Sequence, residues 1–258
     1  MLLGDKMTKT ERFCLLANAV AECKICEQMP VNPCDRSSEK LSNIDRTKIN
    51  VGRPFVNLWN LRQGDLDAEI MIIGQDFGDL GKGESDNTIV YALCEEWKSR
   101  KYTNATEKNL ERMVSETFGK SIGDAEFPLF ITNVANCYRK NATTGEIHPG
   151  WLPLCANKFM FELVDIIQPK IIIVLGRAAF EAMHCLDGAI MECTDEINSV
   201  KGTYAEMINR RYVLKSNAWK IPVFPVYHPG ANSNRNRSSS QQKADWKRIA
   251  DEWKYLKM

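Results

Sequence analysis

The sequence lacks any long hydrophobic run and any strong excess of charge of one sign. Its opening residues, MLLGDKMTKTER, carry charged side chains and no extended apolar stretch, so they predict neither a secretory signal peptide nor a membrane span. The 34 lysines and arginines are balanced by 33 acidic residues, and this near-neutrality neither supports nor excludes nucleic acid as a partner. Internal repeats are absent as well. We therefore expect a cytoplasmic, monomeric, globular protein that does not contact membranes.

The length and apolar content of the chain suit one substantial core. Hydrophobic side chains make up 44% of the 258 residues. The stretch 30–54 is polar and rich in turn-forming residues, which is typical of a long surface connection. We do not place a domain boundary there. The prediction is a single domain over residues 1–258, with an N-terminal helix and segment 1–60 packed on it.

Four short apolar runs alternate with helical patterns along the chain. The runs are rich in β-branched and aromatic residues and continuously apolar, as expected of strands buried on both faces of a parallel sheet; they lie at 69–73, 128–132, 170–175 and 222–227. Helical periodicity occurs at 10–21, 106–118, 151–167, 178–185 and 241–257. This alternation predicts an α/β fold, a three-layer α/β/α arrangement around a central, mostly parallel four-stranded sheet.

Polar side chains follow three of these predicted strands. The loop Gly74-Gln75-Asp76-Phe77-Gly78 comes after the first, Asn133 after the second, and His228 after the fourth. Ligands of open α/β sheets bind beyond the carboxyl ends of the strands. A carboxylate, a carboxamide and an imidazole are therefore expected at one rim, although Asp76, Asn133 and His228 taken singly also suit turns, caps or other structural roles.

The nine cysteines, in a chain without secretory features, predict metal ligands or buried thiols rather than disulfides. Cys23 and Cys26 have the C-x2-C spacing that lets two thiolates bind one centre. Cys137 and Cys155 flank a polar loop that can close a four-thiolate site, and Cys34 lies close enough to replace one of the four. Spacing alone leaves zinc and an iron–sulfur cluster equally open.

Taken in order, these elements resemble the uracil-DNA glycosylase superfamily, and especially its iron–sulfur branches, families 4 and 5. The resemblance rests on CKIC, IMIIGQDFG, ITNVANC, Cys155, QPKIIIVLGRAA and PVYHPG, with Cys137 four residues past Asn133. It implies a structural [4Fe-4S] cluster held by Cys23, Cys26, Cys137 and Cys155. The implied activity is hydrolysis of the N-glycosidic bond of uracil, or a related deaminated base, in DNA for base excision repair.

The resemblance also gives the strand-end residues their roles. Asp76 is the candidate to orient the attacking water and to stabilise the sugar cation. The amide of Asn133 matches the donor and acceptor on the uracil edge, and His228 can donate to a carbonyl oxygen of the departing base. Gly74, Gln75 and Phe77 would complete the base pocket, and Phe77 is the candidate aromatic for stacking.

The first loop departs from the family pattern. The iron–sulfur branches usually carry GEAPG, whereas this chain has GQDFG, closer to the GQDPY of family 1. Gly78 occupies the position of the family 1 tyrosine that blocks the methyl group of thymine, so rejection of thymine is not predicted. Downstream of His228, Arg235 and Arg237 are candidates for phosphate contacts in DNA, without a large apolar wedge beside them.

Two other functions remain open at this point. One is a non-catalytic nucleic-acid-binding relative that keeps the fold and the cluster. The other is a zinc-stabilised α/β hydrolase that acts on a small molecule with Asp76 and His228 as base and acid.

Overall fold

The computed structural model describes residues 7–21, 23, 25, 66–76, 105–122, 124, 126–135, 150–194, 202–230 and 233–257. Three predicted site residues, Cys26, Phe77 and Cys137, lie outside these ranges, as does the polar stretch 30–54.

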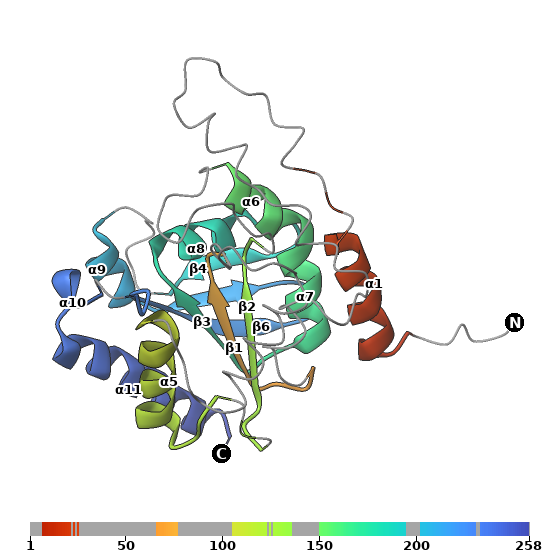
Figure 1. The fold of residues 1–258 in the computed structure, drawn as a ribbon. Helices are drawn as coiled ribbons and strands as arrows, with labels where there is room; N and C mark the ends of the chain where they lie inside the picture. Colours follow the sequence, from red (N-terminus) through yellow and green to blue (C-terminus); the bar gives the residue numbers. More distant parts are fainter. Residues whose placement is uncertain are drawn as a thin grey trace, which may run out of the picture.

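A twisted sheet of six strands forms the centre of the described fold (Figure 1). Its order is β2-β1-β3-β6-β5-β4. The strands are β1 (Ile70–Gly74), β2 (Leu129–Asn133), β3 (Ile171–Leu175), β4 (Ile190–Cys193), β5 (Tyr212–Lys215) and β6 (Lys220–Val226). Strands β2, β1, β3 and β6 pair in parallel, and they are the four strands that the apolar runs predict. The predicted α/β fold is confirmed.

The prediction of four strands needs one correction, because β5 and β4 extend the sheet in antiparallel pairing. Neither contains an apolar run of more than three residues. The four residues of β5 alternate between buried and half-buried, and β4 at the sheet edge is half-buried or exposed along its whole length. Strands covered on one face carry alternating patterns that are hard to recognise over only four residues.

Helices cover both faces of the sheet (Figure 1). In β1, Ile70 and Ile72 face one apolar layer, whereas Met71 and Ile73 face the other, as the two-residue period of a strand requires. The first layer contains α5 (Ala105–Phe118) and α11 (Ser239–Tyr255). The second contains α1 (Lys9–Ala21), α6 (Trp151–Cys155), the π-helical turn η3 (Ala156–Met160), α7 (Phe161–Ile167), α8 (Arg177–Ala182), the 3-10 turn η4 (Met183–Cys185) and α9 (Tyr204–Ile208). The sheet with a helical layer on each face gives the predicted three-layer α/β/α arrangement.

The N-terminal helix α1 packs on α7, as segments distant in sequence but adjacent in space (Figure 1). Arg12 of α1 reaches both Glu162 and Asp165 of α7 at 2.7 Å. Leu16 and Val20 enter the core on the same side. The helix is thus attached by an apolar stripe and by a charged contact at its margin.

The last helices differ from the prediction in one respect. The predicted helix at 241–257 begins earlier, because polar residues before it form α10 (Ser233–Asn236) and the first residues of α11. A capping box between Ser238 and Gln241 begins α11, which explains why serines open a helix here. Trp246, 2% exposed, fixes α11 to the sheet. No helix among the described residues has the length and hydropathy needed to span a bilayer.

Candidate functional site

The carboxyl ends of the four parallel strands meet at one edge of the sheet. Strand β1 has β2 on one side and β3 on the other, so the chain order reverses between β1 and β3. Such a reversal opens a crevice in which α/β proteins bind ligands. Asn133 ends β2, Asp76 lies two residues beyond β1, and His228 lies two residues beyond β6. The sheet thus brings the three predicted groups to the same edge.

Asn133 lies directly against the backbone of Gly74. The two residues are partners in the parallel register of β1 and β2. A Cβ atom added at Gly74 would lie 2.3 Å from Oδ1 of Asn133, closer than real Cβ contacts. The backbone continues the pairing past the strands, because the amide of Val134 donates to the carbonyl of Gly74 at 2.9 Å. Only glycine at position 74 leaves this space to the Asn133 amide.

The carboxylate of Asp76 is oriented by its neighbour. Nε2 of Gln75 donates to Oδ2 of Asp76 at 2.7 Å, and both side chains are half-buried. The backbone of this loop is tied to β2, since the amide of Ala135 donates to the carbonyl of Gln75 at 2.9 Å. The negative charge of Asp76 also acts on His228, where it opposes the effect of burial on the imidazole pKa.

The hydrogen bonding of His228 defines its tautomer. The backbone amide of Gly230 donates to Nδ1 of His228 at 3.1 Å, so Nδ1 is unprotonated and the neutral ring carries its proton on Nε2. Burial lowers the pKa of His228 below its ordinary 6.5, and the charge of Asp76 raises it by less. The residue as a whole is nonetheless exposed to solvent. A neutral imidazole with its proton on Nε2 is a hydrogen-bond donor at neutral pH.

A second glycine of the site, Gly176, lies beside His228. It follows β3 with φ at +90°, a conformation that side chains rarely adopt, and a Cβ there would approach Cβ of His228 to 3.3 Å. The end of β3 therefore contributes backbone but no side chain. Gly74 and Gly176 lie at the ends of the adjacent strands β1 and β3, and each lets one site side chain, Asn133 or His228, approach its backbone closely.

Of the four predicted cluster ligands, the structure describes two. Cys155, 7% exposed, ends α6 in the core that α1 covers, and Cys23 beyond α1 packs against the same apolar cluster. The amide of Ile25 donates to Sγ of Cys23 at 3.5 Å. Among the described residues no group of three or more histidines, cysteines and acids has metal-binding proximity. The two thiols suit soft, sulfur-bound iron, and their predicted partners Cys26 and Cys137 lie outside the described ranges.

The two predicted phosphate contacts lie in different surroundings. Arg235 is exposed on α10. Arg237 is buried, and it donates from Nε and Nη2 to both carboxylate oxygens of Asp245 at 2.5 Å each. Its Nη2 also donates to Oδ1 of Asn209 at 3.1 Å. Because its guanidinium is directed into the protein, Arg237 does not fit the predicted contact with DNA, and we assign it a structural role instead.

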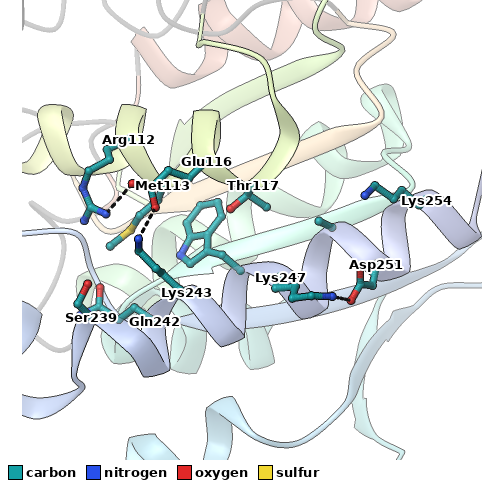
Figure 2. A pocket seen from close by; sticks show the side chains of 12 residues that line it. Arg112, Met113, Glu116, Thr117, Ser239, Gln242, Lys243, Lys247, Asp251 and Lys254 are labelled. Carbon is teal, nitrogen blue, oxygen red and sulfur yellow. Dashed lines mark hydrogen bonds and ion pairs between the residues drawn. The ribbon is translucent and has the colours of Figure 1, made fainter.

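A groove of about 570 Å³ lies between α5 and α11, away from the strand ends (Figure 2). Three of its four basic side chains pair with acids along the two helices. Glu116 pairs with Arg112 at 3.4 Å and with Lys243 at 3.3 Å, and Asp251 pairs with Lys247 at 2.7 Å. The groove holds none of the predicted catalytic residues, so its size alone does not make it the site.

Two contacts at the site have no signature in the sequence. Nδ2 of Asn109 on α5 donates to the carbonyl of Pro229 at 2.9 Å. The hydroxyl of Tyr204 on α9 donates to the carbonyl of Val226 at 2.8 Å. Both side chains bind backbone atoms next to His228 from other elements. Only the packing of the helices on the sheet reveals them.

Comparison with known proteins agrees with this geometry. The family model described as the uracil DNA glycosylase superfamily matches residues 61–254. A type-4 uracil-DNA glycosylase of Sulfurisphaera tokodaii is 28% identical over 200 residues, which cover 75% of this chain and 77% of the relative. A type-4 uracil-DNA glycosylase of Saccharolobus solfataricus is 28% identical over 180 residues, which cover 67% of this chain and 69% of the relative. Since the family model spans most of its length, the chain belongs to the uracil DNA glycosylase superfamily.

Proposed function

We propose that this protein is a DNA glycosylase that hydrolyses the N-glycosidic bond of uracil in DNA and so starts base excision repair. The observation that carries the proposal is the convergence of a carboxylate, a carboxamide and a neutral imidazole at one edge of the sheet. The two relatives named as type-4 uracil-DNA glycosylases point the same way. We further propose that residues 1–258 act as one monomeric domain in the cytoplasm.

In the proposed reaction, the base is first extracted from the stack and read at its hydrogen-bonding edge. Asn133 serves as the reader, because its amide combines a donor and an acceptor and is anchored against Gly74. Gln75 and Phe77 would border the base from the first loop. His228 donates from Nε2 to the carbonyl oxygen on which negative charge grows as the bond breaks.

Asp76 acts on the sugar side of the bond. Its carboxylate, held by Nε2 of Gln75, accepts a proton from the attacking water and stabilises the positive charge of the oxocarbenium-like sugar. The same negative charge lies close enough to His228 to affect the imidazole pKa. The carboxylate proposed for the sugar side thus acts electrostatically on the imidazole proposed for the base side.

Cys23, Cys26, Cys137 and Cys155 are the proposed ligands of a [4Fe-4S] cluster. The burial of Cys155 and the amide hydrogen bond to Cys23 support a sulfur-bound group at this position. When bound, the cluster supplies a covalent brace between the N-terminal segment and the loops that follow the sheet. On the outer surface, Arg235 is the proposed contact to a DNA phosphate.

The decisive experiment measures uracil release from duplex and single-stranded DNA by the purified, cluster-loaded protein. Wild type should release uracil. Asp76→Asn should reduce turnover far more than DNA affinity, because the carboxylate acts mainly in the transition state. A panel of deaminated and mismatched bases then defines the substrate range, and it tests whether Gly78 admits thymine.

Two outcomes would contradict the proposal. Binding of DNA without release of any base would indicate a non-catalytic relative that keeps the fold. A colourless, zinc-containing protein would contradict the iron–sulfur assignment, which predicts visible absorption that is lost in Cys137→Ser.

A further inference from the structure

The peptide group between Pro229 and Gly230 has a hydrogen-bonded neighbour at each end. Its carbonyl oxygen, on Pro229, accepts from Nδ2 of Asn109 at 2.9 Å. Its amide nitrogen, on Gly230, donates to Nδ1 of His228 at 3.1 Å. Because a peptide group is planar and rigid, its oxygen and its N–H cannot turn independently of each other. The side chain of Asn109 is thereby connected to the imidazole of His228 through a single rigid unit.

Helix α5 places Asn109 beside this peptide. The next residue, Leu110, is 5% exposed and belongs to the apolar layer that α5 shares with α11, so the helix is fixed against the sheet. Thr106, three residues before Asn109, lies on the same side of the helix. A Cβ atom added at Gly230 would come within 3.8 Å of Oγ1 of Thr106. The first turns of α5 therefore lie against the turn that carries the peptide.

The surroundings of the peptide make both of its hydrogen bonds important. Pro229 is buried, and a backbone carbonyl without a partner is costly in such a place. The Nδ2 donor of Asn109 meets that need. On the other side, a Cβ atom added at Gly230 would lie 3.1 Å from Nδ1 of His228, closer than most Cβ contacts. Glycine thus lets the imidazole lie directly against the peptide N–H.

The orientation of the peptide decides which imidazole tautomer is favoured. In the observed orientation the N–H points to Nδ1, so the neutral ring carries its proton on Nε2. A peptide turned the other way would present its oxygen to the ring and favour a proton on Nδ1. Nε2 would then be an acceptor and could not donate to an oxygen of a departing base. The bond from Asn109 opposes that turn, because it holds the oxygen on the side of α5.

We propose that Asn109 is a positioning residue that acts through the Pro229–Gly230 peptide to keep His228 in the tautomer with its proton on Nε2. The consequence for base excision rests on the proposed function, whereas the tautomer itself does not. A purely structural bond would attach α5 to the turn without changing which ring nitrogen carries the proton. The tautomer of His228 is therefore the readout that separates the two roles.

The test uses two variants that lack the donor, Asn109→Leu and Asn109→Ala. Leucine keeps a side chain of similar size, and alanine is the best helix former, so a change common to both is due to the lost hydrogen bond. Ser115→Ala is the matched control. It also removes a side-chain hydrogen bond to a backbone carbonyl, that of Arg112, but this bond lies within α5 and does not reach the turn.

Nitrogen NMR of the imidazole distinguishes a protonated ring nitrogen from an unprotonated one. The chain has three histidines, and the His228 signals can be assigned by substitution. At a pH at which the ring is neutral, wild-type His228 should show a protonated Nε2 and an unprotonated Nδ1. Both Asn109 variants should move the two signals toward each other as the second tautomer becomes populated, and Ser115→Ala should match wild type.

Single-turnover release of uracil from saturating DNA gives the second readout. Both Asn109 variants should be slower by about fivefold, the factor expected from one net hydrogen bond, and Ser115→Ala should keep the wild-type rate. Wild-type signals in either Asn109 variant would overturn the inference, as would an equal shift in Ser115→Ala. Shifted signals at a wild-type rate would overturn its consequence for excision. If the wild-type protein releases no base, the proposed function fails, and the NMR comparison still decides whether Asn109 sets the tautomer.

Discussion

Replacing Gly74 by alanine is expected to disable base recognition while leaving the fold intact. The added Cβ would lie 2.3 Å from Oδ1 of Asn133, and real Cβ contacts stay beyond about 3.0 Å, so the amide must move by 0.7 Å or more. Oδ1 is the end of a side chain, which can turn away at low cost in stability. Misplacement of a binding group by about 1 Å can cost roughly a hundredfold in rate. We expect a loss of ten- to a hundredfold in kcat/KM, with a small change in Tm.

The assay is single-turnover release of uracil from DNA, measured alongside thermal unfolding. Gly119→Ala is the matched control, because Gly119 ends α5 with φ at +67° and open space around it. It should lower Tm and leave the rate unchanged. The double variant Gly74→Ala/Asn133→Ala should be little slower than Asn133→Ala, since the clashing amide is already gone. Additive effects of the two substitutions would refute the steric reasoning.

Four further perturbations, one of pH and three substitutions, have defined outcomes. Activity should fall as pH drops below 6.5 through the lowered pKa of His228, because protonation of Nδ1 breaks the bond from Gly230, and a flat profile there would contradict the neutral donor. Asp76→Asn should lower the pKa of His228 further, which an NMR titration of the imidazole would detect. Arg237→Ala should cost about 3 kcal/mol of unfolding free energy in chemical denaturation, because the carboxylate of its partner is left buried and unpaired. Arg235→Ala should leave stability unchanged but weaken DNA binding and flatten its salt dependence by about one phosphate contact.

The pH dependence of stability has the same sign. Burial lowers the pKa of His184 as well as that of His228. The unfolded chain takes up protons at ordinary imidazole pKa values, near 6.5, before the native chain does. Folding is therefore weakened as pH falls below 6.5, and both imidazoles contribute nothing above it.

The parallel core of the fold follows from the apolar runs, whereas its margins do not. Strands such as β3 are buried on both faces, so every residue must be apolar and the pattern is unmistakable. Strand β4 includes Ile190, which is 68% exposed, and lies at the sheet edge. Its residues pair with β5 but are not buried in a core, so they need not be apolar. Such strands become visible only when their partners are known.

In the candidate site, likewise, some residues could be predicted from the sequence and others could not. Asp76, Asn133 and His228 directly follow strands, and the rule that ligands bind at strand ends locates them. Tyr204 and Asn109 lie on helices and donate hydrogen bonds to backbone carbonyls, which are present in every residue. No side-chain spacing encodes such a contact. The Arg237 side chain points inward because it pairs with Asp245 of α11. This contact could not be predicted from the sequence, where Arg237 is one basic residue among polar neighbours.

The register between β1 and β2 has a consequence for how the site loses order on heating. Asn133 is fixed by the hydrogen-bond ladder of a buried sheet, whereas His228 is fixed by a few side-chain contacts to backbone carbonyls. Ladders open only with the whole domain, but isolated side-chain ties can release locally. Warming should therefore loosen the imidazole end before the amide end. Near its melting range, the protein would still recognise the base while its ability to cut the bond declines.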